Sequence, residues 1–155
     1  MAKTMTEIRL SPSALGVFKS CARCFWLEKK RGVKRPRGIF PSLPGGMDRI
    51  LKDRYDAARE AGNVPDELAA AVPGMTLFKD AAALNRWRNW RTGLSASFNG
   101  VVLSGAIDDL GDEQDMGGVI HSVLDYKTRG SAPKPGTSEG YYGHQMDAYA
   151  LMLSK

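Results

Sequence analysis

The side chains of this sequence best suited to chemistry are two carboxylates and a lysine, Asp108, Asp125 and Lys127. The run over 121–128 combines β-branched, aromatic and apolar residues near glycines, which predicts a strand. Residues two apart on a strand share a face, so Asp125 and Lys127 should point the same way, roughly 6–7 Å apart along the backbone. Two carboxylates and an ammonium at one point can hold a divalent metal and activate water against a phosphodiester.

The strands expected around these residues bring Asp108 and Asp125 together. Asn99-Gly100 is a strong hairpin signal, and it leads into a predicted strand over 101–110. A polar loop over 111–118 is expected next, before the strand that holds Asp125. Strands joined this closely can pair antiparallel, and that pairing would carry Asp108 toward Asp125.

Helices are expected on both sides of these strands. Ser11 can cap a helix whose first residue is Pro12. Apolar spacing and breakers predict further helices from Met47 to Gly62, over 65–92 in two pieces broken at Pro73-Gly74, and over 141–153. The expected fold is α/β, with a short mixed sheet flanked by helices.

Length and composition limit the class of protein. The chain has 155 residues, 43% of them hydrophobic, so we expect one core and a single domain over 1–155. A net charge of +5 and a pI near 9.3 suit a polyanionic partner. Because no apolar run approaches membrane-spanning length and the N-terminus lacks a signal-peptide core, we expect a soluble, cytoplasmic protein with no membrane partner.

A basic run over 29–37 is interrupted by proline and is expected to form a loop. Two interpretations stay open for it, a solvated linker or a surface that contacts phosphates. The candidates for nucleic-acid contact are Lys29, Lys30, Arg31, Lys34, Arg35, Arg37 and, further along the chain, Arg129.

Tryptophan and arginine alternate near the end of the predicted helical region, at Trp87 and Trp90 with Arg86, Arg88 and Arg91. Such interleaving could stack bases and contact phosphates. We prefer the commoner arrangement, in which the tryptophans pack into the core and the arginines face water.

Three short motifs occur in a recognisable order: Gly105-Ala-Ile-Asp108, Asp125-Tyr-Lys127 and Gln145-Met-Asp-Ala-Tyr149. Together with the opening Leu10-Ser-Pro-Ser-Ala-Leu15, they resemble the RecB-like branch of the PD-(D/E)XK nuclease superfamily, which includes the CRISPR-associated RecB-like exonucleases. The resemblance covers nearly the whole chain. It implies a restriction-endonuclease-like core and a metal-dependent DNA nuclease, either an exonuclease or an endonuclease. Repair, recombination, phage replication and CRISPR adaptation all use such domains, and the pathway stays open.

The resemblance also implies roles for individual residues. Asp108 and Asp125 would ligate the metal, with the Tyr126 carbonyl on the same side, and Lys127 would assist the attacking water. Oxygen ligands and a phosphate substrate favour Mg²⁺ or Mn²⁺. Gln145 and Tyr149 share one helix face, which in this branch lies over the active site. Gly105 would let the backbone run close beside a neighbour.

The sequence departs from the branch at one ligand. RecB-like domains usually carry a histidine early in the first core helix, and the matching stretch here is Gly45-Gly-Met-Asp48. Asp48 either replaces the histidine as a metal ligand or only stabilises the helix N-terminus, and both interpretations stay open. If Asp48 does not reach the metal, the alternative is a catalytically weak module of the nuclease fold that binds DNA or a protein partner.

Cys21 and Cys24 are the only cysteines. They are too close in sequence for a comfortable disulfide, and the commoner role of such residues is that of small buried hydrophobes. Related nucleases hold an iron–sulfur cluster with three further cysteines near the C-terminus, so we expect no cluster in this chain. The sequence stops at Leu151-Met-Leu-Ser-Lys155, on an apolar helix. A natural minimal form and a truncated piece both stay open, as do a homo-oligomer and other protein partners.

Overall fold

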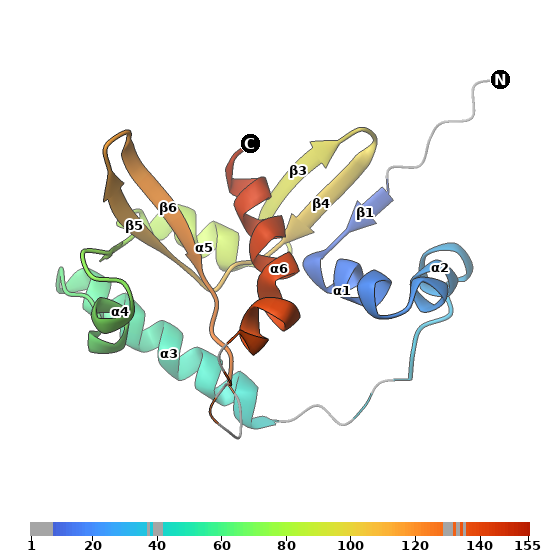
Figure 1. The fold of residues 1–155 in the computed structure, drawn as a ribbon, viewed down its shortest axis with the longest axis horizontal. Helices are drawn as coiled ribbons and strands as arrows, with labels where there is room; N and C mark the ends of the chain where they lie inside the picture. Colours follow the sequence, from blue (N-terminus) through green and yellow to red (C-terminus); the bar gives the residue numbers. More distant parts are fainter. Residues whose placement is uncertain (1–7, 37, 39–41, 129–131, 133, 135) are drawn as a thin grey trace. The chain divides into compact units, whose positions relative to one another are not determined.

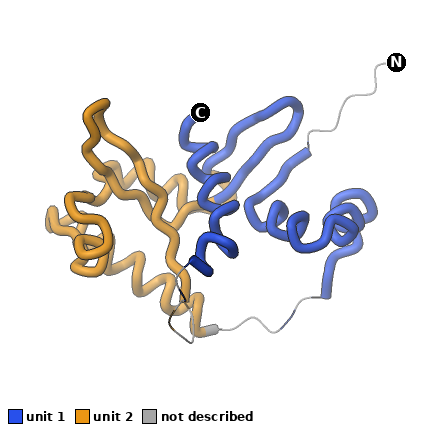
Figure 2. The backbone as a smooth tube through the Cα atoms, in the orientation of Figure 1, with its two compact units in different colours: residues 1–40, 94–105, 134–155 blue, residues 41–93, 106–133 orange. Residues whose placement is uncertain are grey.

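The computed structural model describes residues 8–36, 38, 42–128, 132, 134 and 136–155 (Figure 1). The chain divides into two compact units (Figure 2), unit 1 with residues 1–40, 94–105 and 134–155, and unit 2 with residues 41–93 and 106–133. Each unit combines a three-stranded sheet with helices, which confirms the α/β class. The single domain expected from the length stays a prediction.

Unit 1 is built on a mixed sheet with strand order β1-β4-β3. Strand β1 runs parallel to β4, and β3 pairs with β4 antiparallel. Its elements are β1 (Ile8–Leu10), α1 (Pro12–Ser20), α2 (Ala22–Arg31), β3 (Leu94–Phe98), β4 (Val101–Gly105) and α6 (Thr137–Leu153).

Two local signals in unit 1 act as expected. The Ser11 hydroxyl accepts a hydrogen bond from the N–H of Ala14 at 3.2 Å, and Pro12 opens α1. The hairpin between β3 and β4 turns at Asn99 and Gly100, with φ of 47° and 83°. Left-handed backbone at both central positions fits the right-handed twist of the two strands, which is why this dipeptide favours the turn.

Helix α6 packs on the sheet of unit 1 through Ala148, Tyr149 and Met152, all of which are buried. A Cβ atom at Gly105 would lie 2.9 Å from Tyr149 Cε1 and 3.2 Å from Pro12 Cδ. The close approach expected at Gly105 is thus made by side chains of α6 and α1. The helix begins at Thr137, before the predicted residue 141, because an internal glycine costs a helix only about 1 kcal/mol.

Unit 2 contains an antiparallel sheet with strand order β2-β5-β6. Tyr55, Leu68, Met75 and Leu77 form its buried cluster, against which Tyr126 packs. Its elements are α3 (Ser42–Glu60), α4 (Asp66–Ala71), β2 (Thr76–Leu77), α5 (Ala81–Arg88), β5 (Asp109–Asp115) and β6 (Gly118–Leu124).

The prediction of a single strand over 101–110 is wrong. The chain leaves β4 at Gly105 and enters β5 at Asp109, and the two strands belong to different sheets. Between them Ile107 is buried, and its N–H donates to the Trp87 carbonyl at 3.2 Å instead of to a strand. The bonding of this segment to α5 is a tertiary contact, and a continuous apolar pattern does not reveal it.

The prediction of a polar loop over 111–118 is also wrong, because residues 111–115 belong to strand β5. Its polar side chains bond across the hairpin to β6: Asp112 to His121 at 2.7 Å, and Ser122 to Glu113 at 2.6 Å. Cross-strand pairs of this kind stabilise a strand that composition alone describes as a loop. The turn itself is limited to 116–117.

The observed helix boundaries differ from the predicted ones at two further places. Helix α3 begins at Ser42, five residues before the predicted start, because a proline in the first turn removes only an N–H that has no helical partner. Helix α2 continues through Arg31, so the first three basic residues of the expected loop are helical. Gly32, with φ of 68°, ends it by donating to the Glu28 carbonyl at 3.2 Å.

Candidate active site

Asp108 lies in the short segment that leads into β5. One of its carboxylate oxygens accepts the Tyr126 N–H at 3.0 Å, and the other lies 2.9 Å from the ammonium of Lys52. The side chain is 19% exposed. Asp108 is therefore fixed from two sides while part of its carboxylate still faces solvent.

Asp125 follows directly after Leu124, the last residue of β6, and Lys127 lies two residues further along the chain. The predicted strand over 121–128 thus ends earlier than expected, at Leu124. Asp125 and Lys127 nevertheless form an ion pair, as their shared direction predicts, with Asp125 only 7% exposed. The antiparallel register pairs Asp109 with Leu124. It therefore places the segments that carry Asp108 and Asp125 side by side, as the sequence predicts.

The carboxyl group of Asp108 lies close enough to that of Asp125 to influence the protonation of Asp125. Burial raises the pKa of Asp125, and Lys127 opposes that effect. The charge of Asp108 and a hydrogen bond with its carboxyl group raise the pKa of Asp125 further. A pair of acids held this close to one another is stabilised when a cation is bound between them.

Lys52, a residue that the sequence analysis missed, links Asp48 to Asp108. Lys52, one turn later in α3, places its ammonium 2.9 Å from Asp48 and 2.9 Å from Asp108. Burial lowers the pKa of Lys52, but the two carboxylates outweigh it and the net shift is upward. The spacing of four residues from Asp48 was the signal in the sequence. Asp48 lies in the second turn of α3, so it is not the N-terminal residue that its alternative interpretation assumed.

The donor set fits a hard cation. Asp108 already binds one cation, the Lys52 ammonium, and carboxylate oxygens are the ligands that Mg²⁺ and Mn²⁺ prefer. Within the described part of the chain, no three His, Cys, Asp or Glu side chains are grouped to hold a metal ion. Since Mg²⁺ is commonly held by one or two carboxylates plus water and substrate oxygens, Asp108 and Asp125 meet its needs.

The order of the motifs and this geometry agree with a comparison to known families. Residues 47–155 match the family model of the PD-(D/E)XK nuclease superfamily. The chain belongs to the PD-(D/E)XK nuclease superfamily. The match includes every motif residue from Asp48 to Tyr149, but not the opening Leu10–Leu15. No curated protein and no solved structure matches the chain. None of the described helices has both the length and the apolar character needed to cross a membrane.

A buried charged network lies next to the candidate residues Asp108 and Asp125. Asp109 is fully buried and pairs with Arg59 and with Arg88, the latter at 2.8 Å. The Tyr126 hydroxyl donates to the same carboxylate at 2.8 Å. Arg88 also donates to the main-chain carbonyl of Asp108 at 2.6 Å. The network therefore holds the two segments of the motif through the residues next to Asp108 and Asp125.

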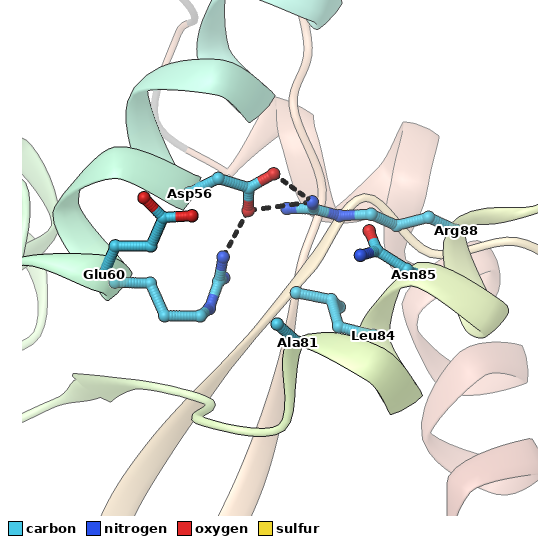
Figure 3. Close-up of a pocket in the computed structure, with 7 residues that line it drawn as sticks. Asp56, Glu60, Ala81, Leu84, Asn85 and Arg88 are labelled. Carbon is cyan, nitrogen blue, oxygen red and sulfur yellow. Dashed lines mark hydrogen bonds and ion pairs between the residues drawn. The ribbon is translucent and has the colours of Figure 1, made fainter.

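Asp56 completes this network on its α3 side (Figure 3). Its carboxylate forms ion pairs with Arg59 and, at 2.7 Å, with Arg88. A small pocket of about 90 Å³ adjoins these groups and is lined by Asp56, Arg59, Glu60, Ala81, Leu84, Asn85 and Arg88. Three of the four charged residues that line this pocket, Asp56, Arg59 and Arg88, are therefore already paired with one another.

The preferred interpretation of the tryptophan and arginine cluster is only partly right. Trp87 is half-buried, with its ring 5.6 Å from that of Phe78. Arg88 is 11% exposed and does not face water, because the buried Asp109 requires cationic partners. Trp90 is 77% exposed, and the guanidinium of Arg91 lies 4.8 Å from its ring centre. No spacing rule predicts that Arg88 is buried, since its partners Asp56 and Asp109 are far away in the sequence.

Gln145 and Tyr149 share a face of α6, as predicted. The Gln145 amide donates to the Tyr149 hydroxyl at 3.1 Å, and Tyr149 is 6% exposed. Both residues belong to unit 1, whereas Asp108, Asp125 and Lys127 belong to unit 2. Their approach to the carboxylates stays a prediction.

The basic candidates for DNA contact lie in α2 and in the segment after it. Lys29, Lys30 and Arg31 occupy the last turn of α2, and the Arg31 guanidinium lies 5.5 Å from the ring centre of Trp26. Lys34 and Arg35 are exposed beyond the helix. The remaining two candidates, Arg37 and Arg129, lie outside the described residues.

Proposed function

We propose that this chain is a metal-dependent deoxyribonuclease of the RecB-like branch, which hydrolyses phosphodiester bonds. The observation that carries the proposal is the Asp125 carboxylate, which contacts both the Asp108 carboxyl and the Lys127 ammonium. Membership of the PD-(D/E)XK superfamily supports the class of reaction. The motif order described above supports the branch.

In this proposal Asp108 and Asp125 hold Mg²⁺ or Mn²⁺, with the Tyr126 carbonyl as a further oxygen donor. When bound, the ion would lower the pKa of a water molecule and neutralise phosphate charge. Lys127 is 32% exposed beside Asp125, so its ammonium can reach a phosphate oxygen and stabilise the charge that develops there. Asp48 would join the ligands only if it exchanges Lys52 for the metal.

DNA is the proposed partner, bound mainly through its backbone. The net charge of +5 and the basic residues of α2 and its following segment supply contacts that do not read sequence. Gln145 would contact the substrate from α6, held in place by its bond to Tyr149. We therefore expect low sequence specificity.

A second candidate function is a DNA-binding or protein-binding module that cleaves slowly or not at all. Two observations favour it: Lys52 is paired with both Asp48 and Asp108, and the histidine that RecB-like domains usually carry is absent at Gly45-Gly-Met-Asp48. If Asp48, the candidate third ligand, stays paired with Lys52, the chain would hold a metal weakly.

Cleavage and binding of DNA separate the two candidates. Asp108→Ala and Lys127→Ala are each tested with Mg²⁺, Mn²⁺ and EDTA, together with the exposed control variants Asp115→Ala and Lys79→Ala. The nuclease predicts that the first two lose cleavage and keep DNA affinity, while both controls behave as the unaltered chain. The module predicts that the unaltered chain binds DNA and cuts none with any metal.

A further inference from the structure

The two cysteines form a contact that the nuclease proposal does not use. Cys21 Sγ lies 2.7 Å from Cys24 Sγ, and both side chains are partly exposed free thiols. The expectation of small buried hydrophobes is therefore wrong. The three-residue spacing, judged too close for a comfortable disulfide, places both sulfurs in contact across one turn of helix.

The position of Cys21 in the fold favours its thiolate. Cys21 is the N-cap of α2, and its sulfur accepts the Cys24 N–H at 3.2 Å. The first turn of a helix presents N–H groups without partners and stabilises negative charge there. The pKa of Cys21 is lowered, first by the hydrogen bond to the Cys24 thiol and then by the bond from the Cys24 N–H.

Arg35 adds a full positive charge to the pair. Its guanidinium hydrogen-bonds to both sulfurs, and these contacts raise the pKa of Arg35. The one acidic residue of α2, Glu28, is already ion-paired with Lys29 at 4.0 Å. A low-pKa, accessible cysteine with a second thiol in contact has the arrangement that thiol–disulfide exchange requires.

We propose that Cys21 and Cys24 are a redox-active dithiol, which forms an intramolecular disulfide by exchange with a small-molecule disulfide such as oxidised glutathione. Cys21 attacks one sulfur of that disulfide as a thiolate, forms a mixed disulfide and releases one thiolate. Cys24 then attacks the Cys21 sulfur after losing its proton to solvent, which forms the Cys21–Cys24 bond and releases the second thiolate. Two protein thiols are oxidised and one small-molecule disulfide is reduced to two thiols.

The proposal does not depend on the nuclease activity, because none of its residues belongs to the metal site. It has a consequence for Arg35, one of the basic candidates for DNA contact. The oxidised pair cannot form a thiolate, so Arg35 then has no negatively charged sulfur with which to pair.

The first test equilibrates the whole chain in glutathione buffers of increasing oxidised fraction, blocks remaining thiols with an alkylating agent and measures the mass. The proposal expects both thiols to be lost together in a single transition, with no glutathione added to the protein. A product that keeps bound glutathione, or a chain that keeps both thiols in every buffer, overturns it. Cys24→Ser should convert the product into a stable glutathione adduct at Cys21.

The second test measures the rate at which Cys21 is alkylated as a function of pH, in the Cys24→Ser background. Arg35→Gln should lower the rate near neutral pH by roughly threefold to tenfold and move the profile to higher pH, because it removes the nearby cation. Lys34→Gln removes the charge next to Arg35 in sequence, and since Arg35 is the cation that lowers the pKa of Cys21, this control should change the rate little. Equal effects of the two substitutions would overturn the role of Arg35.

Discussion

The ammonium of Lys52 lies 2.9 Å from a carboxylate oxygen of Asp108, the first acidic residue of the proposed metal site. The same ammonium lies 2.9 Å from Asp48. The chain thus supplies its own cation at the place where a nuclease of this superfamily would bind a metal. Any divalent ion that binds Asp108 there must compete with Lys52.

Replacing Lys52 by methionine should therefore strengthen metal binding. We expect the affinity for Mn²⁺, measured by calorimetry, to rise by about fivefold, the equivalent of one partly exposed ion pair. Arg54→Met is the matched control, since it removes a charge from the same helix whose partner is Glu67. If both variants bind Mn²⁺ equally, Lys52 does not compete with the metal.

Asp109 should carry much of the stability of unit 2. Asp109→Asn removes the charge that pairs with Arg59 and Arg88 and leaves two nearly buried guanidinium groups short of a partner. We expect a loss of about 3–5 kcal/mol in the free energy of unfolding, measured with urea. Asp115→Asn, at the exposed end of the same strand, should change it by less than about 0.5 kcal/mol. A small effect at Asp109 would mean that the network contributes no net stability.

The pH dependence of stability should reveal the burial of Asp125. Because burial raises its pKa above the ordinary value of 3.8, the unfolded chain loses this proton at lower pH than the folded chain. The stability that the protonated Asp125 contributes to the folded state is therefore fully present below pH 3.8. It is lost as the pH rises through the raised pKa of the folded chain.

Urea unfolding of the unaltered chain and of Asp125→Asn, both in EDTA, measures this effect. The unaltered chain should lose stability relative to the variant as pH rises through that window, and added Mn²⁺ should reverse the loss. A stability difference that stays constant with pH would contradict the raised pKa.

Gly105 and Gly143 should respond in opposite directions to the same substitution. Gly105→Ala places a methyl group against Tyr149 and Pro12, and we expect a loss of about 1–3 kcal/mol in unfolding free energy. Gly143→Ala lies within α6 with nothing within 4 Å of the new atom, and it should gain about 1 kcal/mol. Thermal unfolding of both variants compares them directly. A neutral Gly105→Ala would show that α6 and the strand can separate without cost.

Local signals predicted the elements whose causes lie within a few residues. The Ser11 cap, the turn at Asn99-Gly100 and the shared face of Gln145 and Tyr149 are all set by neighbours in sequence. Such features depend on backbone geometry and side-chain period, which a sequence displays directly. The prediction of a continuous strand over 101–110 failed because the Ile107 N–H bonds to the carbonyl of Trp87 in helix α5, which is distant in sequence.

The sequence by itself determined which residues carry the motif and that Asp125 and Lys127 point the same way, because a two-residue spacing fixes direction along an extended chain. Only the tertiary structure decided which charges meet. In the folded chain Asp108 is partly exposed and pairs with Lys52. Asp109 is fully buried and pairs with Arg88. The physical reason is that burial makes an unpaired charge costly, and its partner is chosen by packing across elements rather than by spacing along the chain.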